Sequence, residues 1–169
     1  MLLACVVSLA ACGGDSDDSS TFEQDDYPFT FEYPADFESS DDVSIDTTLG
    51  GSLEDTIALG VDDSNGIILQ RTTLGVEVTE ENLDQAKSEF DGLVAQIEPG
   101  ASGEAGETGG FPSLTYGAIP LPTPPEGESR LTILFEGDQE YVLNCQSTPE
   151  NRDEINAACD EALATLEGT

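Results

Sequence analysis

Residues 130–145 read RLTILFEGDQEYVLNC and contain two clear strand patterns. Apolar and polar residues alternate on both sides of Gly137-Asp138, which is the pattern of two half-buried strands joined by a tight turn. The stretch therefore predicts an antiparallel hairpin with arms at 130–136 and 140–145. The apolar positions that share a face are Leu131, Ile133 and Phe135 on the first arm, and Tyr141, Leu143 and Cys145 on the second.

The segment after this hairpin predicts a helix over about 149–166. Pro149 suits the first helical position, where its missing N–H costs nothing, and Ser147 or Thr148 can cap the helix. The apolar residues of the segment recur every three to four positions and form one stripe. The members of the stripe are Ile155, Ala158, Cys159, Ala162, Leu163 and Leu166.

Two cysteines lie on the faces that the hairpin and this helix are expected to bury. Cys145 ends the second arm on its apolar face, and Cys159 belongs to the helical stripe, so both point into one sheet–helix interface. We expect a structural disulfide between them, as is usual in an oxidising compartment outside the membrane. The alternatives are two separate buried thiols or a metal site. The metal site is disfavoured because the chain has no histidine and no further cysteine nearby to complete a tetrahedron.

The chain upstream of the hairpin predicts several short strands and one more helix. The helix spans 79–98, with Thr79 as its N-cap and Pro99-Gly100 as its stop. The sequence DDSNG at 62–66 predicts a hairpin turn, since Asn and Gly both accept positive φ. Residues 99–110 and 120–129 are expected to be loops. The predicted strands are 29–33, 43–45, 56–61, 67–74 and 111–119. The apolar stripe of the helix contains Leu83, Ala86, Phe90, Leu93, Val94 and Ile97.

The N-terminal residues 1–11, MLLACVVSLAA, are too short to span a bilayer but match the apolar region of a secretory signal. They end as Leu9-Ala10-Ala11-Cys12, which resembles the lipobox of bacterial lipoproteins, in which the cysteine receives a diacylglyceryl group. Residues 12–26 then read as a lipidated cysteine and an acidic Gly/Ser/Asp tether, and 27–169 as one extracytoplasmic domain. Because no Lys or Arg precedes Arg71, the signal is expected to be truncated at its start. Cys5 is the weaker acceptor, since nothing before it could serve as an apolar region.

Three stretches carry a family resemblance: YPFTFEYPADFE at 27–38, GGFPSLTYGA at 109–118, and the 130–145 hairpin with its cysteine-bearing helix. Together they resemble the PsbP/Mog1-like fold, and more closely small actinobacterial lipoproteins that carry it. The resemblance implies an α+β architecture, a mainly antiparallel sheet sandwiched between two main helices (an α/β/α sandwich). It also implies a non-enzymatic domain that binds proteins. No binding residue of the family transfers, because no functional motif matches.

The charge of the chain restricts its partners. It has 36 acidic residues against 4 basic ones, a net charge of −32, so we expect no binding to nucleic acid phosphates. Basic partners, calcium or a salty exterior fit better. The absence of histidine removes Ser-His-Asp and Cys-His catalysis and imidazole metal ligands.

Candidate chemistry elsewhere is weak, and the sequence predicts no catalytic residue, no metal site and no cofactor. The acid pairs Glu54/Asp55 and Asp62/Asp63 read as solvated turn residues. The stretch beginning at Asp62 fails the EF-hand spacing, because Gly66 comes one position early and position twelve is Thr73.

A Ser-Lys dyad is conceivable, but the only lysine, Lys87, lies among helical acids, where an ion pair is the better account. We therefore expect a cell-surface lipoprotein that acts as a protein-interaction module. The alternatives are a lipoprotein that binds a small ligand or calcium and, less favoured, a carboxylate-dependent hydrolase.

Overall fold

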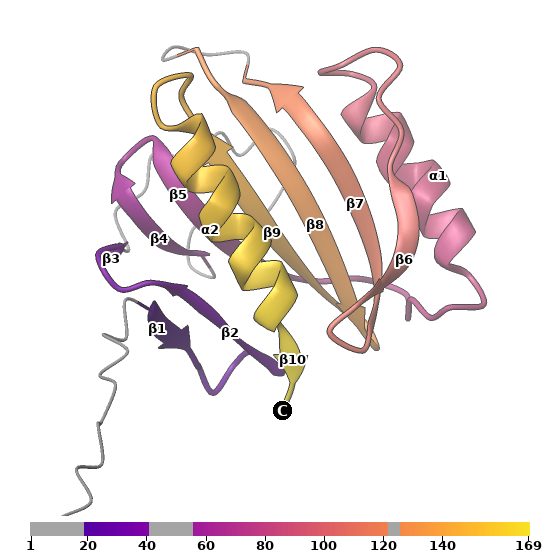
Figure 1. Ribbon diagram of the computed structural model, residues 1–169. Coiled ribbons are helices and arrows are strands. Elements are labelled where there is room, and N and C mark those ends of the chain that lie inside the picture. Colours follow the sequence, from indigo (N-terminus) through magenta and orange to yellow (C-terminus); the bar gives the residue numbers. More distant parts are fainter. Residues whose placement is uncertain (1–18, 41–55, 122–125) are drawn as a thin grey trace, which may run out of the picture.

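The protein is a layered α+β structure, as the sequence predicts. The computed structural model describes residues 19–40, 56–121 and 126–169. An antiparallel sheet of seven strands forms its centre, in the order β3-β4-β5-β9-β8-β7-β6 (Figure 1). The strands of this sheet are β3 (Glu38–Ser40), β4 (Thr56–Asp62), β5 (Asn65–Thr73), β6 (Glu104–Thr108), β7 (Phe111–Pro120), β8 (Glu128–Glu136) and β9 (Gln139–Ser147).

Two helices and a small second sheet cover the central sheet. Helix α1 (Leu83–Val94) packs on the β6–β8 side of one face, and helix α2 (Arg152–Thr165) crosses the other face over β5 and β9 (Figure 1). The small sheet, in the order β1-β2-β10, lies beside α2. Its strands are β1 (Ser19–Phe22), β2 (Phe29–Pro34) and β10 (Glu167–Gly168).

The β8–β9 hairpin has the predicted arms, and each arm buries the predicted face. The two faces nevertheless look in opposite directions. Leu131 lies opposite Asn144, and Arg130 opposite Cys145, so the predicted face of β8 lies in the core with α1 and the predicted face of β9 lies in the core with α2. A sheet that is covered on both sides needs apolar residues on both faces, and Leu134 of β8 accordingly joins the α2-side core.

The core beneath α2 is rich in aromatic rings. Phe22, Phe29 and Phe31 pack together, and Phe29 meets Tyr141 of the hairpin edge to face at 5.5 Å between ring centroids. The tether predicted at 12–26 includes residues that belong to the folded domain. Ser19–Phe22 pairs with β2, and Phe22 is only 3% exposed. A single aromatic ring in a polar segment gave no periodic signal, yet it anchors that segment in the core.

The segment 99–110 is not a continuous loop, because Glu104–Thr108 forms β6 at the edge of the sheet. Its sequence, EAGET, lacks apolar alternation. The strand forms because its backbone pairs with β7 between Phe111 and Thr115. An edge strand that buries little side-chain surface carries no hydrophobic pattern to detect.

The β4–β5 hairpin forms as predicted, but its turn does not use Asn65-Gly66. Both residues already belong to β5, and neither has positive φ. Asp62 shapes the turn instead, since its Oδ1 accepts hydrogen bonds from Ser64 N at 2.8 Å and from Asn65 Nδ2 at 2.9 Å. Gly66 is required for another reason: a Cβ there would lie 2.4 Å from the carbonyl oxygen of Leu59 on β4.

The two helices are shorter at their starts than predicted. Helix α1 begins at Leu83, and Asn82 precedes it. Asn82 Oδ1 accepts from Thr79 N, so Thr79 is not the N-cap. Leu93 is 47% exposed rather than buried. Helix α2 begins at Arg152, after Asn151. Thr148, one of the two predicted caps, instead donates its backbone N–H to Asn65 Oδ1.

Two further predictions end differently or fall outside the described structure. The Pro-rich loop is shorter than the predicted range 120–129, because β7 extends to Pro120 and β8 begins at Glu128. The strand predicted at 43–45 lies outside the described residues.

Candidate functional site

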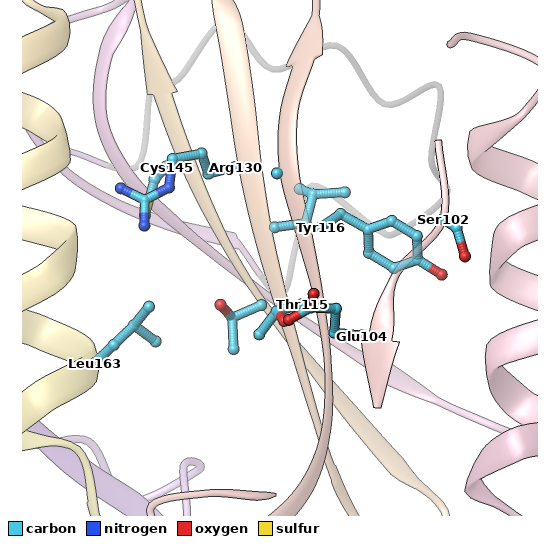
Figure 2. Close-up of a pocket in the computed structure, with 10 residues that line it drawn as sticks. Ser102, Glu104, Thr115, Tyr116, Arg130, Cys145 and Leu163 are labelled. Atoms are coloured by element: carbon cyan, nitrogen blue, oxygen red, sulfur yellow. The ribbon is translucent and has the colours of Figure 1, made fainter. Parts of the chain in front are cut away.

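A groove of about 440 Å³ lies over β7 and β8, between α2 and the strand edge at β6. Helix α2 covers β5 and β9 but leaves this part of the sheet open, so strand residues form the floor (Figure 2). Leu163 of α2 stands on one side of the floor, and Ser102 and Glu104 stand on the other. The floor residues are Thr115, Tyr116, Gly117, Arg130, Leu131, Thr132 and Cys145. The groove is mixed in character, with one cation, one carboxylate, two threonines and two leucines.

A second hollow of about 370 Å³ continues the groove along β7. The two hollows share Ser102, Tyr116 and Gly117. The second one is enclosed by residues 98–102 on one side and 116–119 of β7 on the other. The larger hollow crosses β9, β8 and β7, and the smaller one borders residues 116–119 of β7; we call the two together the trough.

The backbone of β7 is open along this trough. Strand β6 pairs with β7 only from Phe111 to Thr115, whereas β7 continues to Pro120. On its other side β7 stays paired with β8, with an irregularity between Tyr116 and Ile119. Among the described residues, therefore, nothing extends the sheet beyond Tyr116–Pro120 on the β6 side.

A hydrogen-bonded cluster centred on Asp91 fixes the rim of the trough. Asp91 Oδ1 accepts from Gly103 N at 2.8 Å and from Tyr116 Oη at 3.0 Å. Asp91 Oδ2 lies 2.6 Å from Lys87 Nζ and accepts from Ser102 Oγ at 3.2 Å. One carboxylate thus ties helix α1, the segment before β6 and strand β7 together.

The charges in this cluster determine its chemistry. The Lys87 ammonium holds the pKa of Asp91 down at about 2, and the Gly103 amide contributes to the same effect. Burial, together with the neighbouring carboxylate, raises the pKa of Tyr116. Lys87 Nζ also lies 2.9 Å from Ser102 Oγ, which is the contact expected of a Ser-Lys dyad. In this contact Lys87 donates to Ser102 Oγ and Ser102 donates to Asp91 Oδ2, which is the reverse of the direction in which a lysine would take the serine proton.

Every basic side chain of the chain is paired with an acid. Arg130 Nη2 bonds Asp160 at 2.8 Å and its Nη1 bonds Asn156 at 3.0 Å, both on α2. The sequence contains four Lys and Arg residues in total. The ion pairs are Arg71–Asp26, Lys87–Asp91, Arg130–Asp160 and Arg152–Glu128. The cations that could attract an anionic ligand are therefore engaged by the protein's own carboxylates.

The predicted disulfide between Cys145 and Cys159 is confirmed, with Cα atoms 6.2 Å apart. It joins β9 to α2 beneath the groove, and Cys145 is part of the groove lining. The proposed lipidation residue Cys12 and the lipobox residues Leu9, Ala10 and Ala11 lie outside the described residues. They are not placed relative to the groove.

The other residues singled out in the sequence do not form a site. Asp62 organises a turn, and Glu54/Asp55 lie outside the described residues. No group of three or more metal-ligating side chains occurs in the described ranges. Within the same ranges, no helix is long and apolar enough to cross a membrane.

Sequence reasoning missed the Asp91 cluster and the trough. It predicted an ion pair for Lys87 but considered other acids of the helix, although Asp91 follows Lys87 by one helical turn. Ser102 and Tyr116 gave no signal, because they approach Asp91 only through the fold.

No protein-family profile matches the chain, and no curated protein matches it in sequence. Solved structures do match its fold. The cyanobacterial PsbP protein (CyanoP) from Synechocystis aligns with a TM-score of 0.59 at 12% identity, over 95% of this chain and 99% of that one. LpqN, described as involved in cell envelope biogenesis of Mycobacterium tuberculosis, aligns with a TM-score of 0.52 at 12% identity, over 92% of this chain and 87% of that one.

A third structure, from Bacteroides thetaiotaomicron, aligns with a TM-score of 0.55 at 14% identity, over 90% of this chain but 49% of that one. At identities this low the similarity defines the class of fold alone. The chain has the PsbP-like α+β fold, as its sequence predicts.

Proposed function

We propose that this protein is a membrane-anchored, cell-surface lipoprotein whose folded domain is a non-enzymatic protein-interaction module. Cys12 carries the diacylglyceryl anchor, and the domain lies on the extracytoplasmic face. The lipobox-like sequence Leu9-Ala10-Ala11-Cys12 and the internal disulfide support this placement. The similarity in fold to LpqN, an envelope protein by its description, supports it as well.

The observation that carries the binding role is the internal pairing of all four basic side chains in a chain of net charge −32. The partner is therefore basic where it meets this protein, since an acidic or phosphate-bearing partner would meet uncompensated repulsion. The open groove beside α2 provides a concave surface for such a contact.

The contacts of Lys87 and Ser102 support a non-enzymatic role. Lys87 donates to Ser102 Oγ, and Ser102 donates to Asp91 Oδ2, so the serine hydroxyl is not aimed at a general base on Lys87. The chain also has no histidine that could replace Lys87 in this task.

The anchor is tested by producing the full chain in its own host and separating detergent and aqueous phases. The native protein is expected in the detergent phase, with a mature chain that begins at a diacylglyceryl-modified Cys12. Cys12→Ala should block processing and move the protein to the aqueous phase, whereas the matched variant Cys5→Ala should behave as the native chain does. Unchanged processing and partition of Cys12→Ala would refute the anchor.

A further inference from the structure

We propose that the open edge of β7 at Tyr116–Pro120 accepts an extended, lysine- or arginine-bearing segment of the partner protein as an added strand. This inference rests on the proposed function and names the surface and the chemistry of the partner segment.

The backbone of β7 at this point is available for pairing. Gly117 and Ala118 are exposed, and they lie within the irregularity of the β7–β8 ladder. Strand β6 pairs with β7 only as far as Thr115, and Gly103 packs against the ring of Tyr116, so an added strand would pair with β7 beyond Tyr116, beside residues 98–102. Unpaired strand edges are templates for strand addition, and main-chain hydrogen bonds then supply much of the affinity.

Open space lies beside this edge. The hollow between residues 98–102 and residues 116–119 borders the edge, and the larger groove adjoins it at Ser102, Tyr116 and Gly117. A Cβ added to Gly117 would meet no atom within 4 Å, so a side chain at this position has room where the two hollows meet.

The wall opposite the edge is held in place before any partner binds. Asp91 fixes Gly103 and Ser102 on one side and Tyr116 on the other, which sets the separation of the two walls. A trough whose walls are already ordered loses less conformational entropy on binding.

The charges that line the trough favour a basic partner segment. Half-buried Glu98 lines the second hollow and exposed Glu104 lines the groove, while Arg130, the only cation of the lining, is engaged by Asp160. A segment with basic side chains therefore finds carboxylates along the trough. A second copy of this chain would bring another net charge of −32 to the contact, which disfavours self-association through this edge.

The test is a selection of random phage-displayed dodecapeptides on the folded domain, followed by binding measurements with the enriched peptides. We expect enriched peptides with alternating Lys or Arg positions. Gly117→Phe fills the trough and should weaken their binding by about tenfold or more. Gly92→Phe is the matched control: Gly92 is exposed on α1, has equally open space around it and lies on the other layer. It should leave binding unchanged.

Two further measurements separate strand addition from simple charge attraction. Alternate N-methylation of an enriched peptide keeps its charge but removes the N–H donors of one strand edge. Of the two alternate methylation patterns, the one that removes the donors facing β7 should abolish binding. Hydrogen exchange should slow in the segment containing 116–119 when the unmodified peptide is bound. The proposal is overturned if no peptide is enriched, if Gly117→Phe binds as the native protein does, or if both N-methylated peptides retain full affinity.

Failure here is distinguishable from failure of the proposed function. Detergent partition of Cys12→Ala tests the anchor without reference to the trough. If the anchor is confirmed and no peptide binds at β7, the docking surface proposed here is wrong and the assignment as an anchored lipoprotein stands.

Discussion

The phenolic hydroxyl of Tyr116 on β7 donates a hydrogen bond to Oδ1 of Asp91 on α1 at 3.0 Å, across 25 residues of sequence. Asp91 also accepts hydrogen bonds from Gly103 N and Ser102 Oγ and pairs with Lys87, so a carboxylate with about one quarter of its side chain exposed joins three elements. This contact fixes the position of α1 relative to the trough.

Asp91→Asn should destabilise the domain by about 1–2 kcal/mol near neutral pH, because hydrogen bonds to a charged acceptor exceed those to an amide. The pKa of Asp91 is lowered to about 2, from an ordinary value of 3.8. A lowered pKa stabilises the fold above the ordinary value, and that stability is lost as pH falls from about 4 towards 2. Urea unfolding should therefore show the variant and the native chain converging near the acid end. Asp84→Asn, an exposed change on the same helix, should track the native chain throughout; an equal loss in both variants would contradict this role for Asp91.

Glu140→Gln should stabilise the protein at alkaline pH. Glu140 is 9% exposed on β9, and burial raises its pKa to about 7 from an ordinary 4.5. A raised carboxyl pKa makes the folded state bind its proton more tightly than the unfolded state. Stability therefore falls as pH rises from about 4.5 to 7 and stays low above that.

The gain for Glu140→Gln is expected to reach roughly 3 kcal/mol at most near pH 8, and to vanish near pH 4. Denaturant unfolding across this pH range measures it. Glu136→Gln, an exposed change in the same hairpin, should show no such pH-dependent gain. A variant less stable than the native chain near pH 8 would show that the Glu140 carboxylate is stabilising.

Removal of the disulfide with the double variant Cys145→Ala/Cys159→Ala should lower the free energy of unfolding by about 3 kcal/mol. The two residues are 14 positions apart, and closing a loop of that size restricts the unfolded chain by this amount. Reductant should lower the urea midpoint of the native protein and leave that of the double variant unchanged. A native midpoint that ignores reductant, in a protein shown by mass to be reduced, would contradict the prediction.

Stability should rise with ionic strength, because 32 uncompensated negative charges repel one another in the compact state and salt screens them. Thermal unfolding in increasing sodium chloride measures this effect. Calcium chloride at matched ionic strength tests the alternative of a calcium-binding lipoprotein. Since no metal-ligating cluster occurs in the described ranges, we expect equal midpoints in the two salts. A calcium-specific increase, with saturable heat in calorimetry, would favour the alternative.

Local sequence patterns were sufficient to predict both helices and most of the longer strands. Alternation predicted the β8–β9 hairpin, helical spacing predicted the apolar stripe of α2, and the two together predicted the Cys145–Cys159 bond. These features depend on which side of a strand or helix a residue occupies, and that side follows from backbone periodicity alone.

The features that define the candidate site arise from tertiary structure. The predicted faces of the two hairpin arms lie in different cores because helices cover the sheet on both sides, and the pattern of one strand does not show which helix will cover it. Strand β6 forms through backbone pairing without an apolar pattern, and its early end leaves the edge of β7 open. Asp91 and Tyr116 meet only after α1 packs against β7. Backbone periodicity in the sequence located the strands and helices that have an apolar face, whereas long-range pairing and packing formed β1 and β6, brought Asp91 to Tyr116 and left the edge of β7 open.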